Sequence, residues 1–227
     1  MIMTALAAAR RVFAALEQGE MKVAALYVET GGAYYGLEDV DPWDRERDAR
    51  RYAGPHPVVA HPPCERWGRY AEGGPSARVR RMVGDDAGCF AAALAAIRRW
   101  SGIIEHPADS KAWRAFGIPA PPHTGGWIRT LDGGWTCRVD QGWYGHPARK
   151  ATWLLAYGVK PPPLIWDRYV DGRRLEDGFH SSAERAAARA AGVAPVPRIS
   201  ARERLATPEP FRDLLLDIAR SSVRRAA

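Results

Sequence analysis

The chain has few cysteines and no long apolar run, which argues against a disulfide-stabilised protein and against a membrane-spanning one. Its 227 residues include three cysteines, none of them in a Cys-x-x-Cys pair. Such a set argues against a disulfide framework and favours the reducing cytosol. No apolar run reaches the ~18 residues that a membrane span needs. Residues 1–20 are expected to hold an amphipathic helix, over Ala5 to Leu16, and not a signal peptide, because charged side chains interrupt the apolar run.

What the chain does have is positive charge and tryptophan. The net charge is +7, arginine supplies nearly all of it, and many of the nine tryptophans fall in loops rich in glycine and proline. Arginine binds phosphate through its planar fork, so this composition favours a nucleic-acid partner. A GC-rich genome also raises arginine, alanine and glycine, and it explains the charge equally well. Hydrophobic residues make up 46% of the chain, enough for the core of one large domain.

Short apolar runs alternate with helical patterns along the chain. This alternation predicts an α/β fold with a mostly parallel sheet and helices on both faces. Residues 117–134 are rich in proline, glycine and tryptophan and are expected to form an irregular insertion after the third strand. Strands are expected at 21–28, 57–60, 101–105, 135–139 and 152–157, and helices at 78–100, 110–116, 182–191, 200–204 and 207–222.

The stretch His61-Pro62-Pro63-Cys64 follows an apolar run that predicts a buried strand. Each proline fixes φ near about −65°, so the loop is stiff and holds the thiol in a defined direction. The carboxyl end of a strand is where open α/β sheets bind their ligands. A nucleophilic cysteine and a structural Pro-Pro turn with an inert cysteine fit this stretch equally well.

Two further features stand near strand ends. The turn Glu29-Thr30-Gly31-Gly32 follows the first expected strand, and glycine lets backbone approach a ligand closely, although a plain turn also explains it. The charged run 38–51 contains Asp41 and Asp48, which either bind ribose and adenine, by analogy with dinucleotide sites, or belong to a solvated face. Glu105-His106-Pro107 ends the third expected strand.

Together these features resemble the cytosine-C5 DNA methyltransferase family, most closely its small phage-type members. Four segments carry the resemblance, which covers residues 21–160 and, more loosely, the tail. They are Tyr27 to Leu37, similar to the family's glycine pattern; Pro62-Pro63-Cys64, similar to its nucleophile motif; Glu105-His106-Pro107, similar to its Glu-Asn-Pro motif; and Arg149-Lys150-Ala151-Thr152, similar to a basic segment of phage-type members.

The resemblance implies an enzyme that transfers a methyl group from S-adenosylmethionine to C5 of a cytosine flipped out of DNA. The Cys64 thiolate would add to C6, and Glu105 would polarise N3 if burial keeps it partly protonated. Arg149 or its neighbour Lys150 would lie near the base carbonyl. A positive charge from Arg149 or Arg66 is expected to favour the thiolate.

The resemblance also implies a Rossmann-like, methyltransferase-type sheet and a cofactor site. The N-terminal helix (1–20) would precede a catalytic domain (21–160), with 117–145 as a reduced DNA-recognition insertion and 161–227 as a helical segment completing the domain. Asp41 would bind the ribose hydroxyls and Asp48 the adenine amine. The remaining cofactor-binding residues implied are Tyr27, Glu29, Gly31, Gly32 and Pro62.

Two departures from the family pattern leave alternatives open. Glu29 replaces the first glycine, so it either binds the cofactor's ammonium group or indicates a different donor used with the same Cys64 chemistry. His106 replaces the asparagine that often braces the catalytic loop. A third alternative is a non-catalytic DNA-binding module on a methyltransferase scaffold. A zinc site built from His61, Cys64, Cys137 and His146 matches no common zinc spacing, and no metal is expected.

Overall fold

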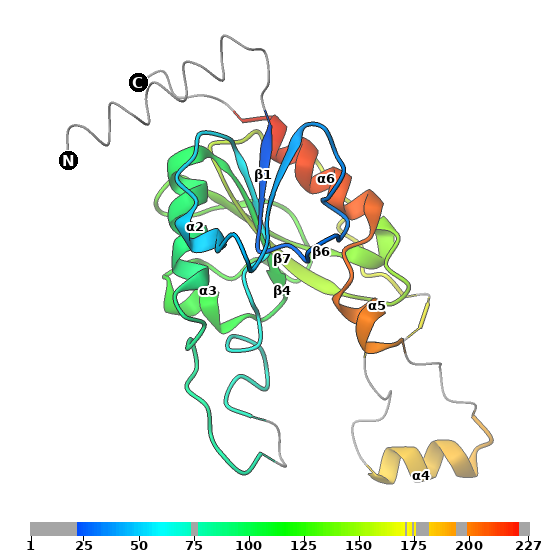
Figure 1. The fold of residues 1–227 in the computed structure, drawn as a ribbon. Helices are drawn as coiled ribbons and strands as arrows, with labels where there is room; N and C mark the ends of the chain where they lie inside the picture. Colours follow the sequence, from blue (N-terminus) through cyan, green and yellow to red (C-terminus); the bar gives the residue numbers. More distant parts are fainter. Residues whose placement is uncertain are drawn as a thin grey trace.

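The computed structural model describes residues 22–73, 77–170, 172–173, 175, 182–193 and 199–222. The helix expected over Ala5 to Leu16 lies outside these residues. One seven-stranded sheet, in the order β2-β1-β3-β4-β7-β6-β5, forms the centre of the molecule (Figure 1). The strands are β1 (Val23–Leu26), β2 (Val40–Trp43), β3 (Val58–Ala60), β4 (Gly102–Pro107), β5 (Ile128–Arg129), β6 (Trp135–Asp140) and β7 (Ala151–Tyr157).

The sheet is mixed, so the expected mostly parallel sheet is right for only half of it. Strands β2, β1, β3 and β4 pair in parallel, whereas β7 is antiparallel to both β4 and β6, and β5 is antiparallel to β6. A parallel pair needs a crossover connection of about a dozen or more residues. The β5–β6 and β6–β7 connections are shorter, so they join antiparallel neighbours.

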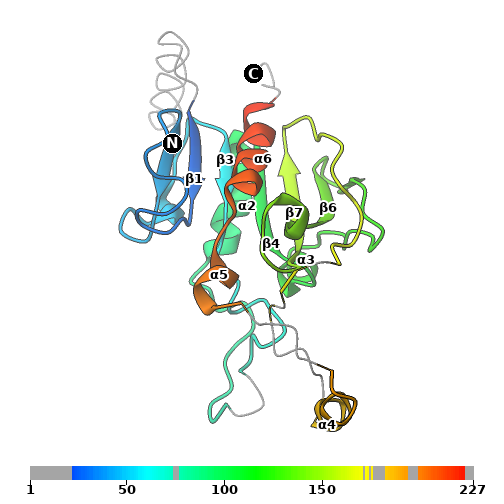
Figure 2. The same ribbon diagram turned by 90° about the vertical axis from the view of Figure 1, so that its right-hand side faces the viewer.

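Helices cover both faces of the sheet, as the sequence predicts. Figure 2 shows α6 in front of the sheet and α2 behind it. The strands β1 and β3 are buried on both faces, which explains why their sequences are continuous apolar runs. The helices are α2 (Cys89–Trp100), α3 (Lys111–Ala115), α4 (Ser182–Ala190), α5 (Ala201–Leu205) and α6 (Glu209–Arg220), with 3₁₀ turns η1 (Ala49–Arg51) and η2 (Gln141–Tyr144).

Each face of the sheet has its own core. Alternate residues of β1 point to opposite faces, with Leu26 toward α2 and Ala25 toward α6. On the α2 side, Phe90 and Ile97 contribute to a core that includes the buried Trp113 of α3. The α6 side is formed by the helix's apolar stripe against the strands, with fully buried members Phe211, Leu215, Leu216, Ile218, Ile103 and Leu154.

Helix α2 begins eleven residues later than the sequence predicts. Residues 78–88 form part of a long connection that extends from the lower edge of the sheet in Figure 1. Positive φ at Ala87 (56°) and Gly88 (78°) is incompatible with a continuous helix. Asp86 caps the helix instead, because its carboxylate accepts from the backbone N–H of Gly88 at 2.9 Å and of Phe90 at 2.9 Å.

Strand β2 lies inside the run that the sequence suggested was a charged face. Its burial alternates only weakly, and it contains Pro42. Because β2 is an edge strand, a residue without a backbone N–H is tolerated there. The pairing of Val40 with Val23, and not the apolar pattern, therefore defines this strand.

Replacing Asp86 by alanine is expected to destabilise the protein by about 1–2 kcal/mol. The change removes both cap bonds to α2 and the bond from Trp67 Nε1, which is 2.8 Å from the Asp86 carboxylate. Urea denaturation followed by circular dichroism measures the effect. The exposed neighbour Asp85 is the matched control, and an equal loss in Asp85→Ala would contradict this role for Asp86.

Candidate active site

The carboxyl ends of β1, β3 and β4 bring three sequence segments to one edge of the sheet. Leu26 pairs with Ala60, and Ala60 pairs with Ile104, so the next residues on each strand begin at the same level. The backbone N–H of His61 continues this register by donating to the carbonyl of Leu26 at 3.0 Å. The glycine turn, the Pro-Pro-Cys loop and Glu105 therefore share this edge.

Cys64 starts an anchored turn. Its carbonyl accepts from the backbone N–H of Trp67 at 3.0 Å and of Gly68 at 3.1 Å. The Trp67 side chain is buried, and its carbonyl accepts from the N–H of Lys111 at 2.8 Å. The two prolines before Cys64 and this anchor after it fix the position of the cysteine, whose side chain is half-buried.

The electrostatic surroundings of Cys64 favour the neutral thiol. Burial raises the pKa of the thiol, and the negative charge of Glu105 raises it further. The positive charge of Lys150 acts in the opposite direction. The cation that favours the thiolate is thus Lys150, and not Arg149 or Arg66 as the sequence suggested. Arg149 donates from Nε to Asp140 at 3.1 Å, and Arg66 has a buried Nη1 without a hydrogen-bond partner among the described residues.

Glu105 uses both carboxylate oxygens. Its Oε2 is 3.0 Å from Nδ1 of His61, and its Oε1 accepts from Nε2 of Gln141 at 3.1 Å. The Gln141 amide also donates to Oγ1 of Thr152 at 2.8 Å. The carboxylate is therefore held from β3 on one side and from the end of β6 on the other.

These contacts keep Glu105 ionised, contrary to the expectation that burial leaves it partly protonated. Burial by itself raises the pKa of Glu105, but the hydrogen bond and charge of His61 and the charge of Lys150 outweigh it. The net effect lowers the pKa to about 2. Glu105 is a carboxylate at neutral pH in the free protein.

The ionised Glu105 is expected to make the stability of the fold pH-dependent. Because its pKa is lowered on folding, the carboxylate contributes stability above its ordinary value of 4.5, and this contribution is lost as the pH falls toward 2. Chemical denaturation of the wild type and Glu105→Gln across this range measures it. The wild type should lose more stability than the variant; parallel curves would contradict the lowered pKa. The exposed Glu38→Gln is the control.

The cluster contains three further residues, Tyr34, Gln141 and Thr152. The sequence patterns did not predict them as site residues. Tyr34 is 3% exposed, and its hydroxyl lies 2.8 Å from Nε2 of His61. The signal in the sequence was slight: Gln141 lies two residues after an expected strand, and Tyr34 lies within the glycine-rich pattern. Their approach to His61 and Glu105 depends on the tertiary fold.

His106 is buried beneath the Pro-Pro loop. Its Nδ1 lies 2.8 Å from Oγ of Ser110, the residue that caps α3. Burial lowers the pKa of the ring to about 4, although the charge of Glu105 and the nearby carbonyls of Pro63 and Pro62 oppose this. Nε2 makes no well-formed hydrogen bond among the described residues. A neutral His106 thus packs between the Pro-Pro loop and α3.

The glycine turn after β1 is tight and open on one side. The N–H of Gly32 donates to the carbonyl of Glu29 at 2.9 Å, and a Cβ at position 32 would lie only 2.9 Å from that oxygen. Gly31 has φ of 68°, and a Cβ there would meet no atom within 4 Å. Glu29 is exposed, and Tyr27, with φ of 60°, donates its hydroxyl to the carbonyl of Cys89 at 3.0 Å.

The two carboxylates expected at a cofactor make local ion pairs. Asp41 accepts from Trp43 Nε1 at 2.7 Å and from Arg47 at 2.6 Å, and Asp48 caps η1 and pairs with Arg50 at 2.7 Å. The negative charge of Asp48 reaches Tyr27, whose pKa it helps to raise. The carboxylate that is hydrogen-bonded to the glycine turn belongs to another residue than Asp41 or Asp48.

That acidic group is Asp44, which is 5% exposed and follows β2. Its Oδ2 accepts from Thr30 Oγ1 at 2.7 Å and from the Tyr35 hydroxyl at 2.6 Å. Its Oδ1 accepts from the backbone N–H groups of Glu46 and Arg47, each at 3.1 Å. Asp44 therefore joins the glycine turn to the end of β2.

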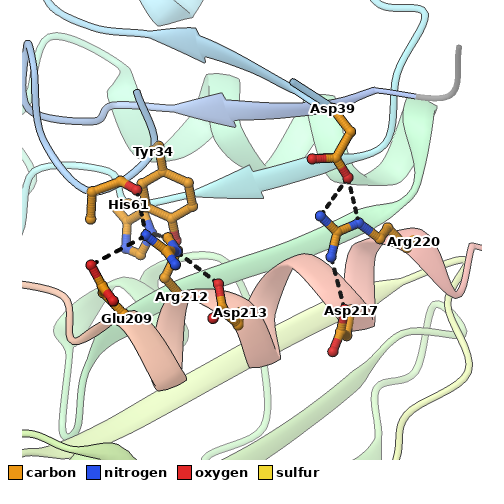
Figure 3. Close-up of polar contacts among 9 residues, drawn as sticks. Tyr34, Asp39, His61, Glu209, Arg212, Asp213, Asp217 and Arg220 are labelled. Atoms are coloured by element: carbon orange, nitrogen blue, oxygen red, sulfur yellow. Dashed lines mark hydrogen bonds and ion pairs between the residues drawn. The ribbon is translucent and has the colours of Figure 1, made fainter. Parts of the chain in front are cut away.

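Helix α6, which covers the face of the sheet opposite to α2, also holds the glycine-rich segment after β1 in place. Figure 3 shows Arg212 beside Tyr34 and His61, and its Nη1 donates to the carbonyl of Ala33 at 2.8 Å. Farther along the helix, Arg220 pairs with Asp39, just before β2. The C-terminal helix is thus part of the support of the candidate site.

The zinc alternative finds no geometric support. In the residues that the structure describes, no group of three or more His, Cys, Asp or Glu side chains is arranged to hold a metal ion. Cys137 is fully buried in the α6-side core. Nδ1 of His146 instead lies 2.6 Å from the carbonyl of Ala148.

The reactivity of Cys64 is expected to follow its two charged neighbours. Lys150→Met should slow alkylation by iodoacetamide at neutral pH, and Glu105→Gln should accelerate it, each by roughly two- to fivefold, because they shift the thiol pKa upward and downward respectively. Mass spectrometry of the peptide that contains Cys64 measures the rate. Arg149→Met, which loses only the contact with Asp140, is the control; a change as large as that of Lys150→Met would contradict the assignment.

Comparison with known proteins found no match. No family model, no curated protein and no solved structure matches it. Among the described residues, no helix has the length and apolar character that crossing a bilayer requires. The chain has an α/β fold with a mixed seven-stranded sheet, and its candidate functional residues lie at the carboxyl ends of the strands.

Proposed function

We propose that this protein is a DNA cytosine-C5 methyltransferase in which Cys64 is the nucleophile. The observation that carries the proposal is the meeting of Cys64 and Glu105 from the neighbouring parallel strands β3 and β4, close enough for the Glu105 charge to act on the thiol. A thiol and a carboxyl group at one site are what addition to C6 and proton transfer at N3 require.

Three residues, Cys64, Glu105 and Lys150, have separate roles in the proposed reaction. The Cys64 thiol loses its proton to water and the thiolate sulfur bonds to C6, which makes C5 nucleophilic, while Glu105 shares a proton with N3 and stabilises the charge that develops on the ring. Once C5 carries the methyl group, release of the C5 proton to water and of the thiolate from C6 restores the ring. Sharing that proton also weakens the negative charge that raises the pKa of Cys64. Lys150 supplies the positive charge beside both groups.

The glycine turn fits S-adenosylmethionine, which supplies an electrophilic methyl group when bound. The space beside Gly31 is open, and the exposed carboxylate of Glu29 suits a cofactor that carries an ammonium group. Asp41 and Asp48 would hold the ribose and adenine ends after exchanging their present arginine partners. Tyr27, Gly32 and Pro62 would complete this site.

The fold is compatible with the methyltransferase-type sheet that this function implies. Strands β1, β2, β3, β4 and β6 share one direction, and β7 is inserted antiparallel between β4 and β6. The long basic connection after Cys64 leaves the same edge of the sheet, and its exposed arginines suit the phosphates of DNA. The exposed arginines are Arg69, Arg78, Arg80 and Arg81.

Nucleoside mass spectrometry of DNA from expressing cells tests the proposal. Wild-type protein should produce 5-methylcytosine, and Cys64→Ala should not. A different mass on cytosine that is also lost in Cys64→Ala would mean another donor, the alternative that the exposed Glu29 favours. Purified protein with S-adenosylmethionine and DNA is the second arm. Unmodified DNA in both arms would overturn the proposal in favour of a DNA-binding module.

A further inference from the structure

His61 precedes the Pro-Pro-Cys loop and bridges two elements of the site. Its Nδ1 is 3.0 Å from Oε2 of Glu105, and its Nε2 is 2.8 Å from the hydroxyl of Tyr34. The His61 side chain is 13% exposed. Figure 3 shows the Tyr34 and His61 side chains together beside α6. A histidine held at both nitrogens has a fixed orientation, so its protons are directed at known atoms.

The two oxygen partners suit both protonation states of the ring. A carboxylate only accepts, so Nδ1 carries a proton and donates it to Glu105. The Tyr34 hydroxyl can donate to Nε2 of the neutral ring or accept from the imidazolium. Burial raises the pKa of Tyr34 well above its ordinary value, so the hydroxyl itself stays neutral. When the imidazolium gives its Nδ1 proton to Glu105, its Nε2–H still donates to the Tyr34 hydroxyl, so His61 keeps that contact in the neutral state.

Glu105 needs such a partner if it is to act as an acid. In the free protein its pKa is about 2, so the carboxylate carries no proton of its own at neutral pH. A titratable group hydrogen-bonded to Glu105 can supply the proton for N3. His61 is that group, because the other hydrogen-bonded neighbour, Gln141, is an amide and does not ionise.

We propose that His61 is the positioning residue for Glu105 and stores the proton that Glu105 passes to N3 of the bound base. The inference rests on the proposed function. As the Cys64 thiolate bonds to C6, the His61 imidazolium loses its Nδ1 proton to Glu105, and Glu105 gives a proton to N3. Glu105 ends as the carboxylate and His61 as neutral imidazole. The N3 proton returns by the same path when the thiolate leaves.

Titratable and charged groups from four parts of the chain surround this relay. Glu105 and His106 lie on β4, Cys64 on the loop of His61 itself, and Lys150 at the start of β7. Arg212 and Asp213 of α6 act on Tyr34 with opposite signs. Oε2 of Glu105 lies 3.0 Å from Nδ1 of His61. Because the relay needs the imidazolium form of a histidine, proton transfer to the base is expected to weaken as the pH rises.

Hydrogen exchange at C5 of cytosine, without a methyl donor, isolates this step, because addition of Cys64 to C6 labilises the C5 hydrogen. Duplex DNA in deuterated buffer is the substrate. His61→Asn keeps an N–H near the Nδ1 position but stores no proton. We expect its exchange rate at neutral pH to fall about 10²-fold. We also expect the decline of the wild-type rate at high pH to disappear. Wild-type rate and pH profile in His61→Asn would overturn the proposal.

A second measurement separates failure of this inference from failure of the proposed function. If the wild type shows no exchange and no covalent complex with 5-fluorocytosine DNA, the methyltransferase proposal fails, and proton transfer to the base fails with it. Carbon-13 NMR of the Glu105 carboxyl group then tests the pairing itself. Its pKa should be higher in His61→Asn than in wild type or in Tyr34→Phe, which keeps the ring. An unchanged Glu105 titration would overturn the pairing too.

Discussion

Replacing Cys64 by alanine is expected to abolish the covalent complex between the protein and DNA that carries 5-fluorocytosine at the target position. Fluorine at C5 cannot leave as a proton does, so the adduct through the cysteine sulfur accumulates once methyl transfer has occurred. Wild-type protein should be trapped on the DNA, whereas the alanine variant has no sulfur to form the bond. Denaturing electrophoresis and intact mass measure the complex.

Cys89→Ala is the matched control for this experiment. Cys89 is also a free, partly exposed cysteine, but it stands at the start of α2, where burial and, next, the charge of Asp86 raise its pKa. The control should form the complex at the wild-type rate. Loss of the complex in Cys89→Ala and its persistence in Cys64→Ala would move the nucleophile to α2. In the wild type, the trapping rate should rise with pH at first, because burial and Glu105 raise the pKa of Cys64.

Replacing Glu105 by glutamine is expected to slow methyl transfer by about 10²–10⁴-fold. Glutamine preserves the size of the side chain but cannot relay a proton to N3, and it loses the ion pair with His61. The same variant should make the free Cys64 thiol more reactive toward iodoacetamide, because a negative charge beside it is gone. Opposite changes in the two rates would mark Glu105 as a proton-transfer group. A single-turnover methylation assay measures the first rate.

Two further measurements test whether the loss of activity in Glu105→Gln reflects lost proton transfer. Gln141→Leu removes the hydrogen bond to Oε1 of Glu105 but leaves the carboxylate and His61 in place, so a smaller loss, roughly tenfold, is expected. Circular dichroism establishes whether each variant keeps the fold. Methylation by Glu105→Gln within a factor of about three of the wild type would contradict an acid role for this residue.

The sequence alone determined most of the strands and helices and the position of the nucleophile candidate. Strands β1, β3 and β4 are short apolar runs because they are buried on both faces, and such runs are visible without a structure. The prolines before Cys64 fix the loop locally, and the apolar stripe of α6 repeats at helical spacing. In each case the determining interaction lies within a few residues of the chain.

The tertiary structure decided the order and direction of the strands, the edge strand β2, the start of α2 and the contacts of Glu105, since the determining contacts join distant residues. Strand β2 is an edge strand defined by its pairing with β1, and the antiparallel half of the sheet follows from short connections. α2 starts late because Asp86 caps it. The ionisation of Glu105 depends on His61, 44 residues away, and its orientation on Gln141, 36 residues away. The sequence predicts that Glu105 is buried, and burial alone would raise its pKa. The neighbouring side chains that the tertiary structure brings close to Glu105 lower its pKa instead.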